Sequence, residues 1–193
     1  MNDERQNPDR DDWTARARVE MDRKTKPPGS LGRIEEIAVR LAAIQRTVRP
    51  DVATRRLLLF AGDHGVTEEG ISPYPAAVTA QMILNFLRGG AAVSVLARLG
   101  DISMRVIDVG VAAQWTPDVI AHPEFRACKI RAGTRNLARE CAMTSAECDA
   151  ALDAGRQQVA EAAADGVRLL GLGEMGIGNT TPAAALCAAL FHL

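Results

Sequence analysis

The chain has 193 residues, a formal net charge of −1, and 47% hydrophobic and 24% charged residues, as is ordinary for a globular protein with one real core. The balanced charge argues against a nucleic-acid binder, which usually carries a basic excess. The polar first ten residues do not resemble a signal peptide, and no apolar run approaches the roughly 20 residues that cross a membrane, so we expect a cytoplasmic protein.

The beginning of the chain is predicted to be helical. A short helix is expected over residues 13–21, and a turn rich in Pro and Gly follows it. Ser30 is then predicted to cap a long helix, because apolar residues over 34–48 recur at spacings of three and four. Pro50 is expected to end this helix.

The rest of the chain alternates predicted strands and helices. Residues 56–60 form an apolar run without alternation, which is typical of a buried parallel strand. Helices are expected over 76–88 and 91–99, separated by a Gly-Gly pair, and a second strand over 104–109.

The last third begins with residues 130–136, which are predicted to be a strand or a loop near the edge of the site. Thr144 and Glu147 have the spacing of a capping box, so a helix is expected from there to about residue 164. Residues 167–170 predict a third buried strand, and residues 183–191 predict a helix.

This alternation indicates an α/β fold that is Rossmann-like, with three layers and a mainly parallel sheet. We expect an N-terminal helical segment over 1–50 and a partial α/β domain over 51–193. Three strands make a small sheet with an exposed edge, and the last helix stays apolar to its end, so we expect a fragment or a truncated product. Ligands bind beyond the carboxyl ends of such strands, where the chain has polar or glycine-rich residues at 62–65, 108–110 and 171–181.

Residues 171–182 read Gly-Leu-Gly-Glu-Met-Gly-Ile-Gly-Asn-Thr-Thr-Pro. A strand, a glycine loop and a helix start present backbone N–H groups to an anion, and glycine lets a phosphate approach closely. Thr181 is expected to be the N-cap, and Pro182 suits the first helical position. Glu174 and Asn179 add a carboxylate and an amide, so the predicted site recognises more than a phosphate.

Three interpretations of this glycine segment stay open. Residues 171–176 match G-x-G-x-x-G, which would suit an NAD-dependent oxidoreductase, but the motif lies late and only the 17 residues 177–193 follow it. A tight structural turn is the second interpretation. The additional Gly-Asn-Thr-Thr over 178–181 favours the third, a mononucleotide or phosphoribosyl site.

Asp63 and His64 directly follow the first predicted strand. They are interpreted either as an acid–base or positioning pair, or as a loop cap and a turn residue. Glu68 and Glu69 are expected to be solvated loop charges.

Ser72, Tyr74 and Gln81 lie on the loop and helix that follow. Their hydrogen-bonding groups and one aromatic ring suit a planar heterocycle, although each alone is more often a surface residue.

No metal or cofactor is predicted. The cysteines form no CxxC pair and have no zinc spacing, so we expect buried or incidental thiols in a reducing compartment. The three histidines are scattered and form no His-x-x-x-His pair. The cysteines are Cys128, Cys141, Cys148 and Cys187, and the histidines are His64, His122 and His192.

Five segments together resemble the nicotinate-nucleotide–dimethylbenzimidazole phosphoribosyltransferase family of cobalamin lower-ligand assembly. They match in the family's order and span nearly the whole chain. They are KPPGSLG at 26–32, FAGDHGV at 60–66, SPYPAAVTAQM at 72–82, GTRN at 133–136 and GEMGIGNTTP at 173–182.

The resemblance implies that nicotinate mononucleotide donates its 5-phosphoribosyl group to 5,6-dimethylbenzimidazole, giving α-ribazole 5′-phosphate and nicotinate. The pyridinium of the donor is already a good leaving group, so no metal-bound pyrophosphate is needed. A carboxylate removes the benzimidazole N–H proton as the ring nitrogen attacks. The resembled family is homodimeric, which implies a homodimer for a full-length protein.

The resemblance also implies residue roles. The family's catalytic glutamate lies near the end of a far longer chain, and no residue here corresponds to it, so a catalytically inactive fragment that binds a nucleotide or a base is the alternative. Glu174 is a glutamate of the motif, not that base. The implied phosphoribosyl-binding residues are Glu174, Gly176, Gly178, Asn179 and Thr180, and the implied base-binding residues are Ser72, Tyr74 and Gln81.

Overall fold

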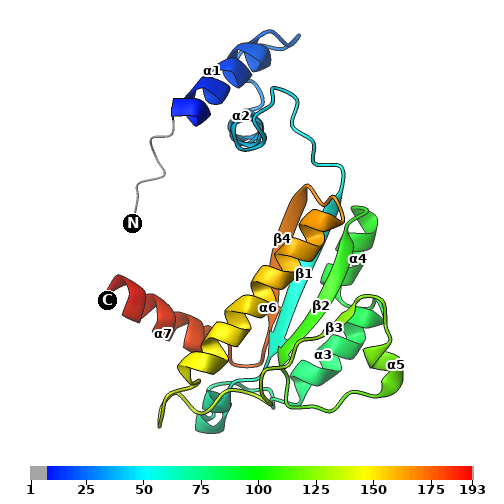
Figure 1. The fold of residues 1–193 in the computed structure, drawn as a ribbon, viewed down its shortest axis with the longest axis vertical. Coiled ribbons are helices and arrows are strands. Elements are labelled where there is room, and N and C mark those ends of the chain that lie inside the picture. Colours follow the sequence, from blue (N-terminus) through cyan, green and yellow to red (C-terminus); the bar gives the residue numbers. More distant parts are fainter. Residues whose placement is uncertain (1–7, 193) are drawn as a thin grey trace. The chain divides into compact units, whose positions relative to one another are not determined.

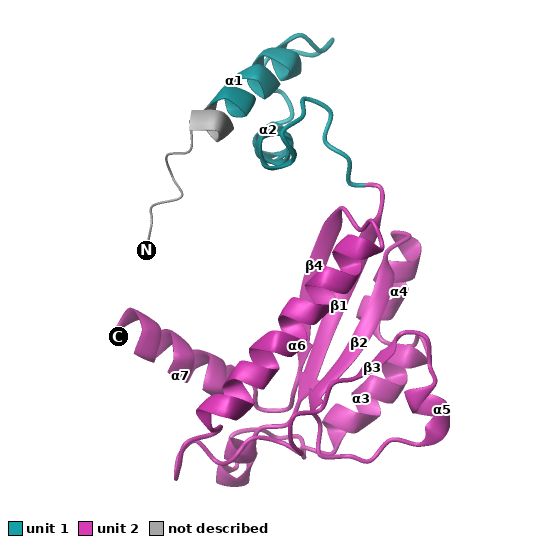
Figure 2. Ribbon diagram, in the orientation of Figure 1, with its two compact units in different colours: residues 1–52 teal, residues 53–193 magenta. Residues whose placement is uncertain are grey.

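The computed structural model describes residues 8–192 and divides the chain into two compact units, Met1–Val52 and Ala53–Leu193 (Figure 2). In its described part the first unit contains two helices, α1 (Pro8–Asp22) and α2 (Arg33–Gln45). Small side chains let these two helices approach closely: Ala17 of α1 packs with Val39 and Ala42 of α2 in one buried cluster.

Both ends of α2 differ from the prediction. The helix follows Gly32, at φ 54°, and no side chain caps it, because Ser30 lies in a turn where its N–H bonds to the carbonyl of Pro27. It ends well before Pro50, because Arg46 adopts the left-handed conformation at φ 51° and its N–H bonds to the carbonyl of Ala42.

The apolar stripe predicted along this helix is not its buried face. Ile34 and Ile44 are 66% and 58% exposed, whereas Val39, Ala42 and Ala43 are buried. The spacing of the stripe correctly predicted a helix, but the residues that pack within this unit are smaller.

The second unit is an α/β fold built on one parallel sheet (Figure 1). The order of the strands is β3-β2-β1-β4, and every neighbouring pair is parallel. The strands are β1 (Arg55–Gly62), β2 (Ser103–Gly110), β3 (Phe125–Ala127) and β4 (Leu169–Met175).

Helices cover both faces of this sheet. The helices α3 (Val78–Leu87) and α4 (Ala92–Leu99) lie on one face, and α6 (Ser145–Ala164) crosses the other (Figure 1). The core lies between the sheet and α3, where Leu59 and Val106 pack with Ile83 and Phe86. The remaining elements are η1 (Gly65–Glu69), α5 (Pro117–Ile120) and α7 (Thr180–Phe191).

By length and composition alone, the segment Val78–Leu99 is apolar enough to cross a membrane. It consists of the two helices α3 and α4, which are separated at Gly89 and Gly90. Ile83 and Phe86 of α3 belong to the core beneath it, which explains the apolar composition without a membrane.

Helix α6 is tied to the rest of the unit at both of its ends. At its start, the predicted capping box is confirmed: Thr144 accepts from the N–H of Glu147, whose carboxylate in turn accepts from the N–H of Thr144. Glu147 also accepts from Arg135 at 2.9 Å. At its end, Asp165 accepts from Arg56 at 2.8 Å and from Arg105 at 3.1 Å.

Two strands depart from the predictions. The short strand β3 was not predicted, whereas residues 130–136 form a loop, which is one of the two forms expected for them. The third predicted strand exists as β4, but it is an edge strand and not a buried one: Leu169 and Leu172 are 41% and 74% exposed.

Candidate functional site

The carboxyl ends of β1 and β2 meet a loop that is distant in sequence. The carbonyl of Gly110, at the end of β2, accepts from the N–H of Asp63 at 3.0 Å and from that of Gly133 at 2.9 Å. The N–H of Thr134 then donates to the carbonyl of Asp63 at 2.9 Å. Three of the predicted site segments are therefore joined through backbone hydrogen bonds.

Asp63 fixes the chain at this edge with its side chain as well. Its Oδ2 accepts from the N–H of Ala112 at 2.8 Å, across the end of β2. Its Oδ1 is buried and has no hydrogen-bond partner within the described part of the chain. A buried carboxylate oxygen without a donor is costly, so Asp63 offers an acceptor to a group from outside.

His64 lies between this edge and the glycine segment. Its carbonyl accepts from the N–H and the hydroxyl of Thr67, in the middle of η1. Burial of the imidazole lowers the pKa of His64, and the nearby charges of Asp63 and Glu174 oppose that shift in part. The imidazole is therefore neutral at neutral pH and can accept or donate one hydrogen bond without carrying a charge.

The glycine segment is more strand-like than predicted. Residues 171–175 belong to β4, so the loop is only Gly176 to Asn179. Helix α7 starts at Thr180, and Asn179 takes the N-cap position without capping through its side chain. The predicted N-cap at Thr181 is wrong, because its N–H already closes a turn onto the carbonyl of Gly178 at 3.2 Å.

Two glycines of this loop have no room for a side chain. A Cβ at Gly176 would lie 2.3 Å from the carbonyl oxygen of Gly62 and 2.9 Å from Nε2 of His64. Gly178 has φ +78°, and a Cβ there would lie 2.9 Å from Cγ2 of Thr67. The loop is therefore pressed directly onto the segment that follows β1.

Several amides of this loop are already used within the protein. The N–H of Ile177 donates to Oγ1 of the buried Thr79 at 3.1 Å, and that of Asn179 to the carbonyl of Gly176 at 3.1 Å. An anion at the start of α7 would thus be held by fewer backbone N–H groups than the sequence suggested. Side chains have to supply the rest.

Glu174 and Asn179 supply side chains at this place. Glu174 is the second-last residue of β4 and has an exposed side chain, and its Oε2 accepts from Nδ2 of Asn179. The pair spans the loop from its strand to its helix. A carboxylate held by an amide beside a helix start suits hydrogen bonds to sugar hydroxyls.

The segment with Ser72, Tyr74 and Gln81 adjoins the same loop. Ile71 lies 3.0 Å from the position of a Cβ at Gly178, and Thr79 binds Ile177, so both ends of this segment contact the glycine loop. Oγ of Ser72 accepts from the N–H of Tyr74 at 3.2 Å. Tyr74 is 63% exposed, and Gln81 is exposed on the first turn of α3.

The loop after β3 contributes Asn136 and Arg139, for which the sequence predicted no individual role. Nδ2 of the buried Asn136 donates to Oε1 of Glu69 at 2.7 Å, and Nε of Arg139 donates to the same oxygen at 2.8 Å. The expectation that Glu69 is only a solvated charge is therefore wrong. The Gly-Thr-Arg-Asn motif that ends at Asn136 was the available signal.

Asp108 is a second buried carboxylate near this edge. Its Oδ1 accepts from the N–H groups of Gly110 and Val111 at 3.0 and 2.7 Å, and its Oδ2 accepts from Nε1 of Trp115 at 2.6 Å. Lys129 lies 3.4 Å from Oδ2. All of these bonds are internal, so Asp108 shapes the end of β2.

Within residues 8–192 no group of three or more His, Cys, Asp or Glu residues is arranged to hold a metal ion. The four cysteines are free thiols. Cys128 is half-buried and burial raises its pKa, whereas the other three are exposed, so they fit the expected incidental thiols and not the buried ones.

A model of the phosphoribosyltransferase family matches residues 6–193. The chain belongs to this phosphoribosyltransferase family. Relatives of the same family include the nicotinate-nucleotide–dimethylbenzimidazole phosphoribosyltransferases of Thermus thermophilus and Geobacter sulfurreducens, each 51% identical over 93% of this chain. A crystal structure of the Thermus thermophilus enzyme superposes with a TM-score of 0.88 at 49% identity, over 94% of this chain.

This phosphoribosyltransferase chain spans about half the length of those relatives. It covers 52% and 50% of the two proteins and 54% of the chain in the crystal structure. The shared half includes the sheet and every site segment described above.

Proposed function

We propose that the chain forms the phosphoribosyl-binding half of an enzyme that transfers the 5-phosphoribosyl group from nicotinate mononucleotide to 5,6-dimethylbenzimidazole. The observation that carries this proposal is about 50% identity, over nearly the whole chain, to relatives that bear the name of this enzyme. The products are α-ribazole 5′-phosphate and nicotinate.

In this reaction one carbon–nitrogen bond replaces another. The bond from C1′ of the ribose to the pyridinium nitrogen breaks, and its electron pair leaves with nicotinate. A benzimidazole nitrogen forms the new bond to C1′, and the proton of the other ring nitrogen passes to a carboxylate acting as general base. That carboxylate comes from outside these 193 residues.

The residues at the carboxyl edge of the sheet support roles in binding. We assign Glu174 and Asn179 to the ribose hydroxyls, because their side chains meet across the glycine loop. We assign the phosphate to the loop and the helix start, which contain Gly176, Gly178 and Thr180. The burial of Gly176 against His64 fixes where that loop lies.

The acceptor base is assigned to Ser72, Tyr74 and Gln81. The exposed ring of Tyr74 provides a face on which a planar heterocycle can stack. Asp63 and His64 position the edge beneath both substrates. We further propose that the complete protein acts in the cytoplasm as a homodimer.

The proposal is tested with a chimera in which residues 1–193 are joined to the remaining half of the Thermus thermophilus relative. We expect the chimera to form α-ribazole 5′-phosphate from both substrates, as separated by chromatography. An inactive chimera that is folded, measured beside an active Thermus thermophilus parent, would contradict the proposal.

Glu174→Gln in this chimera is expected to reduce kcat/KM by about 10- to 100-fold, because a charged acceptor for ribose hydroxyls is lost. Glu68→Gln is the matched control, because Glu68 is an exposed glutamate of the neighbouring η1 helix. Equal effects of both substitutions would remove Glu174 from the assigned site.

A further inference from the structure

We propose that Glu69 is a positioning residue for the acceptor base, because its carboxylate fixes the segment that carries Ser72 and Tyr74. Glu69 is the last residue of η1, and this segment follows it directly. The inference rests on the proposed function, but the position of the segment can be measured without any reaction.

The short helix η1 lies between the loop after β3 and the glycine loop. At its start, the N–H of Gly65 donates to Oγ1 of Thr134 at 3.2 Å, and a Cβ at Gly65 would lie 2.6 Å from the carbonyl oxygen of Thr134. In its middle, Cγ2 of Thr67 lies 2.9 Å from the position of a Cβ at Gly178. Because η1 is in close contact on both sides, its end is held in one place.

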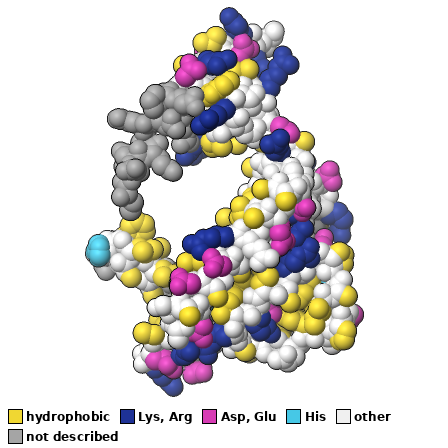
Figure 3. All heavy atoms as spheres, in the orientation of Figure 1, with side chains coloured by type: hydrophobic (Ala, Val, Ile, Leu, Met, Phe, Trp, Pro, Cys, Tyr) yellow, Lys and Arg dark blue, Asp and Glu magenta, His cyan; other side chains and the backbone are white. Residues whose placement is uncertain are grey.

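Glu69 fastens this end of η1 to the loop after β3. Its Oε1 accepts from Nδ2 of Asn136 at 2.7 Å and from Nε of Arg139 at 2.8 Å. Asn136 is buried, and its Oδ1 accepts from the N–H of Ala138 at 3.0 Å, so its amide is already oriented. Figure 3 shows acidic and basic side chains beside one another at this end of the second unit. Hydrogen bonds to a charged acceptor are stronger than neutral ones, so this fastening is firm.

The chain turns directly after Glu69. Gly70 has φ 71°, and its N–H bonds to the carbonyl of Thr67 at 3.1 Å. Ile71 then reaches the glycine loop, with its Cδ1 3.0 Å from the position of a Cβ at Gly178. The direction in which the chain continues toward Ser72 is therefore set within two residues of Glu69.

Packing contributes little to where the ring of Tyr74 lies, because Tyr74 is 63% exposed. Its backbone is tied to Ser72, whose Oγ accepts from the N–H of Tyr74 at 3.2 Å. Beyond Tyr74 the chain is held by the buried Thr79, whose Oγ1 accepts from the N–H of Ile177. The ring is thus placed by two anchors, Glu69 before it and Thr79 after it.

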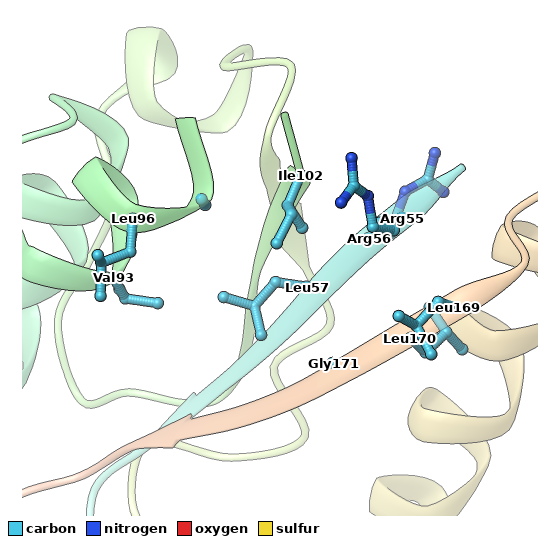
Figure 4. A pocket seen from close by; sticks show the side chains of 10 residues that line it. Arg55, Arg56, Leu57, Val93, Leu96, Ile102, Leu169, Leu170 and Gly171 are labelled. Atoms are coloured by element: carbon cyan, nitrogen blue, oxygen red, sulfur yellow. The ribbon is translucent and has the colours of Figure 1, made fainter. Parts of the chain in front are cut away.

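An apolar groove of the same unit lies at the opposite end of the strands. It has a volume of about 300 Å³ and lies between α4 and β4 (Figure 4). Arg55 and Leu169, the first residues of β1 and β4, belong to its lining. A base in this groove would be far from a group held at the glycine loop, which lies beyond the carboxyl ends of the strands. The base is therefore assigned to the segment of Tyr74.

The position of Tyr74 is measured in the chain of 193 residues by fluorine NMR. Tyr74 is the single tyrosine of the sequence, so 3-fluorotyrosine labels this ring alone. Glu69→Ala removes the acceptor of Asn136 and Arg139, and we expect the signal to shift by more than its linewidth or to split. Glu69→Gln should keep the wild-type signal, because both donors bind Oε1 and glutamine retains that oxygen.

Glu68→Ala is the matched control. Glu68 is the neighbouring glutamate of η1, its side chain is 65% exposed, and it approaches Arg139 only to 3.9 Å. It should leave the signal unchanged. Asn136→Ala breaks the same bond from the other side and should move the signal as Glu69→Ala does. An unchanged signal in Glu69→Ala, or an equal shift in Glu68→Ala, would overturn the proposal.

The consequence for the base is measured in the chimera described above. We expect Glu69→Ala to raise the KM for 5,6-dimethylbenzimidazole about five- to tenfold and to leave the KM for nicotinate mononucleotide within about twofold. Glu69→Gln should restore the KM for the base. Equal increases in both KM values would overturn the proposal, because Glu69 would then support the whole site. An inactive wild-type chimera would contradict the proposed function, whereas the fluorine signal would still decide whether Glu69 places Tyr74.

Discussion

Gly176 lies directly against the imidazole of His64, with only 2.9 Å between Nε2 and the position of a Cβ at Gly176. The same Cβ would lie 2.3 Å from the carbonyl oxygen of Gly62. The chain that leaves β4 is thus pressed onto the chain that leaves β1. This contact joins two predicted site segments, 62–65 and 176–179, whose residues are more than a hundred positions apart.

Gly176→Ala should separate these two segments. We expect it to lower the free energy of unfolding by about 3 kcal/mol, because the obstructing atoms include backbone that cannot turn aside. The measurement is urea unfolding. Gly155→Ala is the control: Gly155 lies within α6 with open space around it, so alanine there should raise stability by about 0.5–1 kcal/mol. A Gly176→Ala variant as stable as the wild type would show that the contact is loose.

His64 should make stability depend on pH in the neutral range. Burial lowers its pKa below 6.5, so the unfolded chain binds a proton more readily than the folded one. The stabilisation is present above pH 6.5 and is lost as the pH falls through the folded-state value. We expect the melting temperature of the wild type to fall more between pH 7.5 and 5.5 than that of His64→Gln. Parallel slopes would contradict this assignment.

Glu147 should stabilise the start of α6 in mildly acidic solution. Its hydrogen bond with Arg135, together with the N–H of Thr144, lowers the pKa of Glu147 from 4.5 to about 2. Its contribution is therefore complete above pH 4.5 and disappears as the pH falls toward 2. Glu147→Gln should lower the melting temperature at pH 7 and flatten its acid dependence. Asp153→Asn, on the exposed face of the same helix, should do neither.

Asp108 should be among the most important side chains for stability. Asp108→Ala leaves the N–H groups of Gly110 and Val111 and the charge of Lys129 without their acceptor. We expect a loss of about 3 kcal/mol in urea unfolding. Asp149→Asn on the exposed surface of α6 should stay within about 0.5 kcal/mol of the wild type. A small effect at Asp108 would mean that water replaces its bonds.

The strands that are buried on both faces of the sheet could be predicted from the sequence. β1 and β2 have long apolar runs, and their inner residues Leu58 and Ile107 are fully buried, so sequence and structure agree. β3 has three residues, of which only Phe125 is buried, and no periodic pattern can emerge from so short a segment. Its pairing depends on β2, which supplies the partner backbone.

The predicted boundary of the strand β4 was wrong for a specific physical reason. Gly171 and Gly173 suggested a loop, but both are paired strand residues. Leu57 fills the space above Gly171, with its Cδ1 3.0 Å from the position of a Cβ. The missing side chain at Gly171 is thus compensated by Leu57 on the neighbouring strand. A pattern in the sequence around Gly171 cannot predict this contact, because Leu57 is distant in sequence.

The site was predictable in its segments, but not in its contacts. The convergence of 62–65 with the glycine loop followed from the rule for parallel strands. The bond between Asn136 and Glu69 could not be predicted, because it joins two loops whose approach depends on the path after β3.

The ion pairs at the two ends of α6 give this helix a mechanical role. Its start is fastened to the loop at Arg135, on the side where ligands would bind, and its end to Arg56 and Arg105 at the opposite edge. A helix of 20 residues is about 30 Å long, so one stiff rod connects both ends of the strands. If ligand binding shifts the Arg135 loop, α6 would therefore transmit that shift to Arg56 and Arg105 at the other end of the strands.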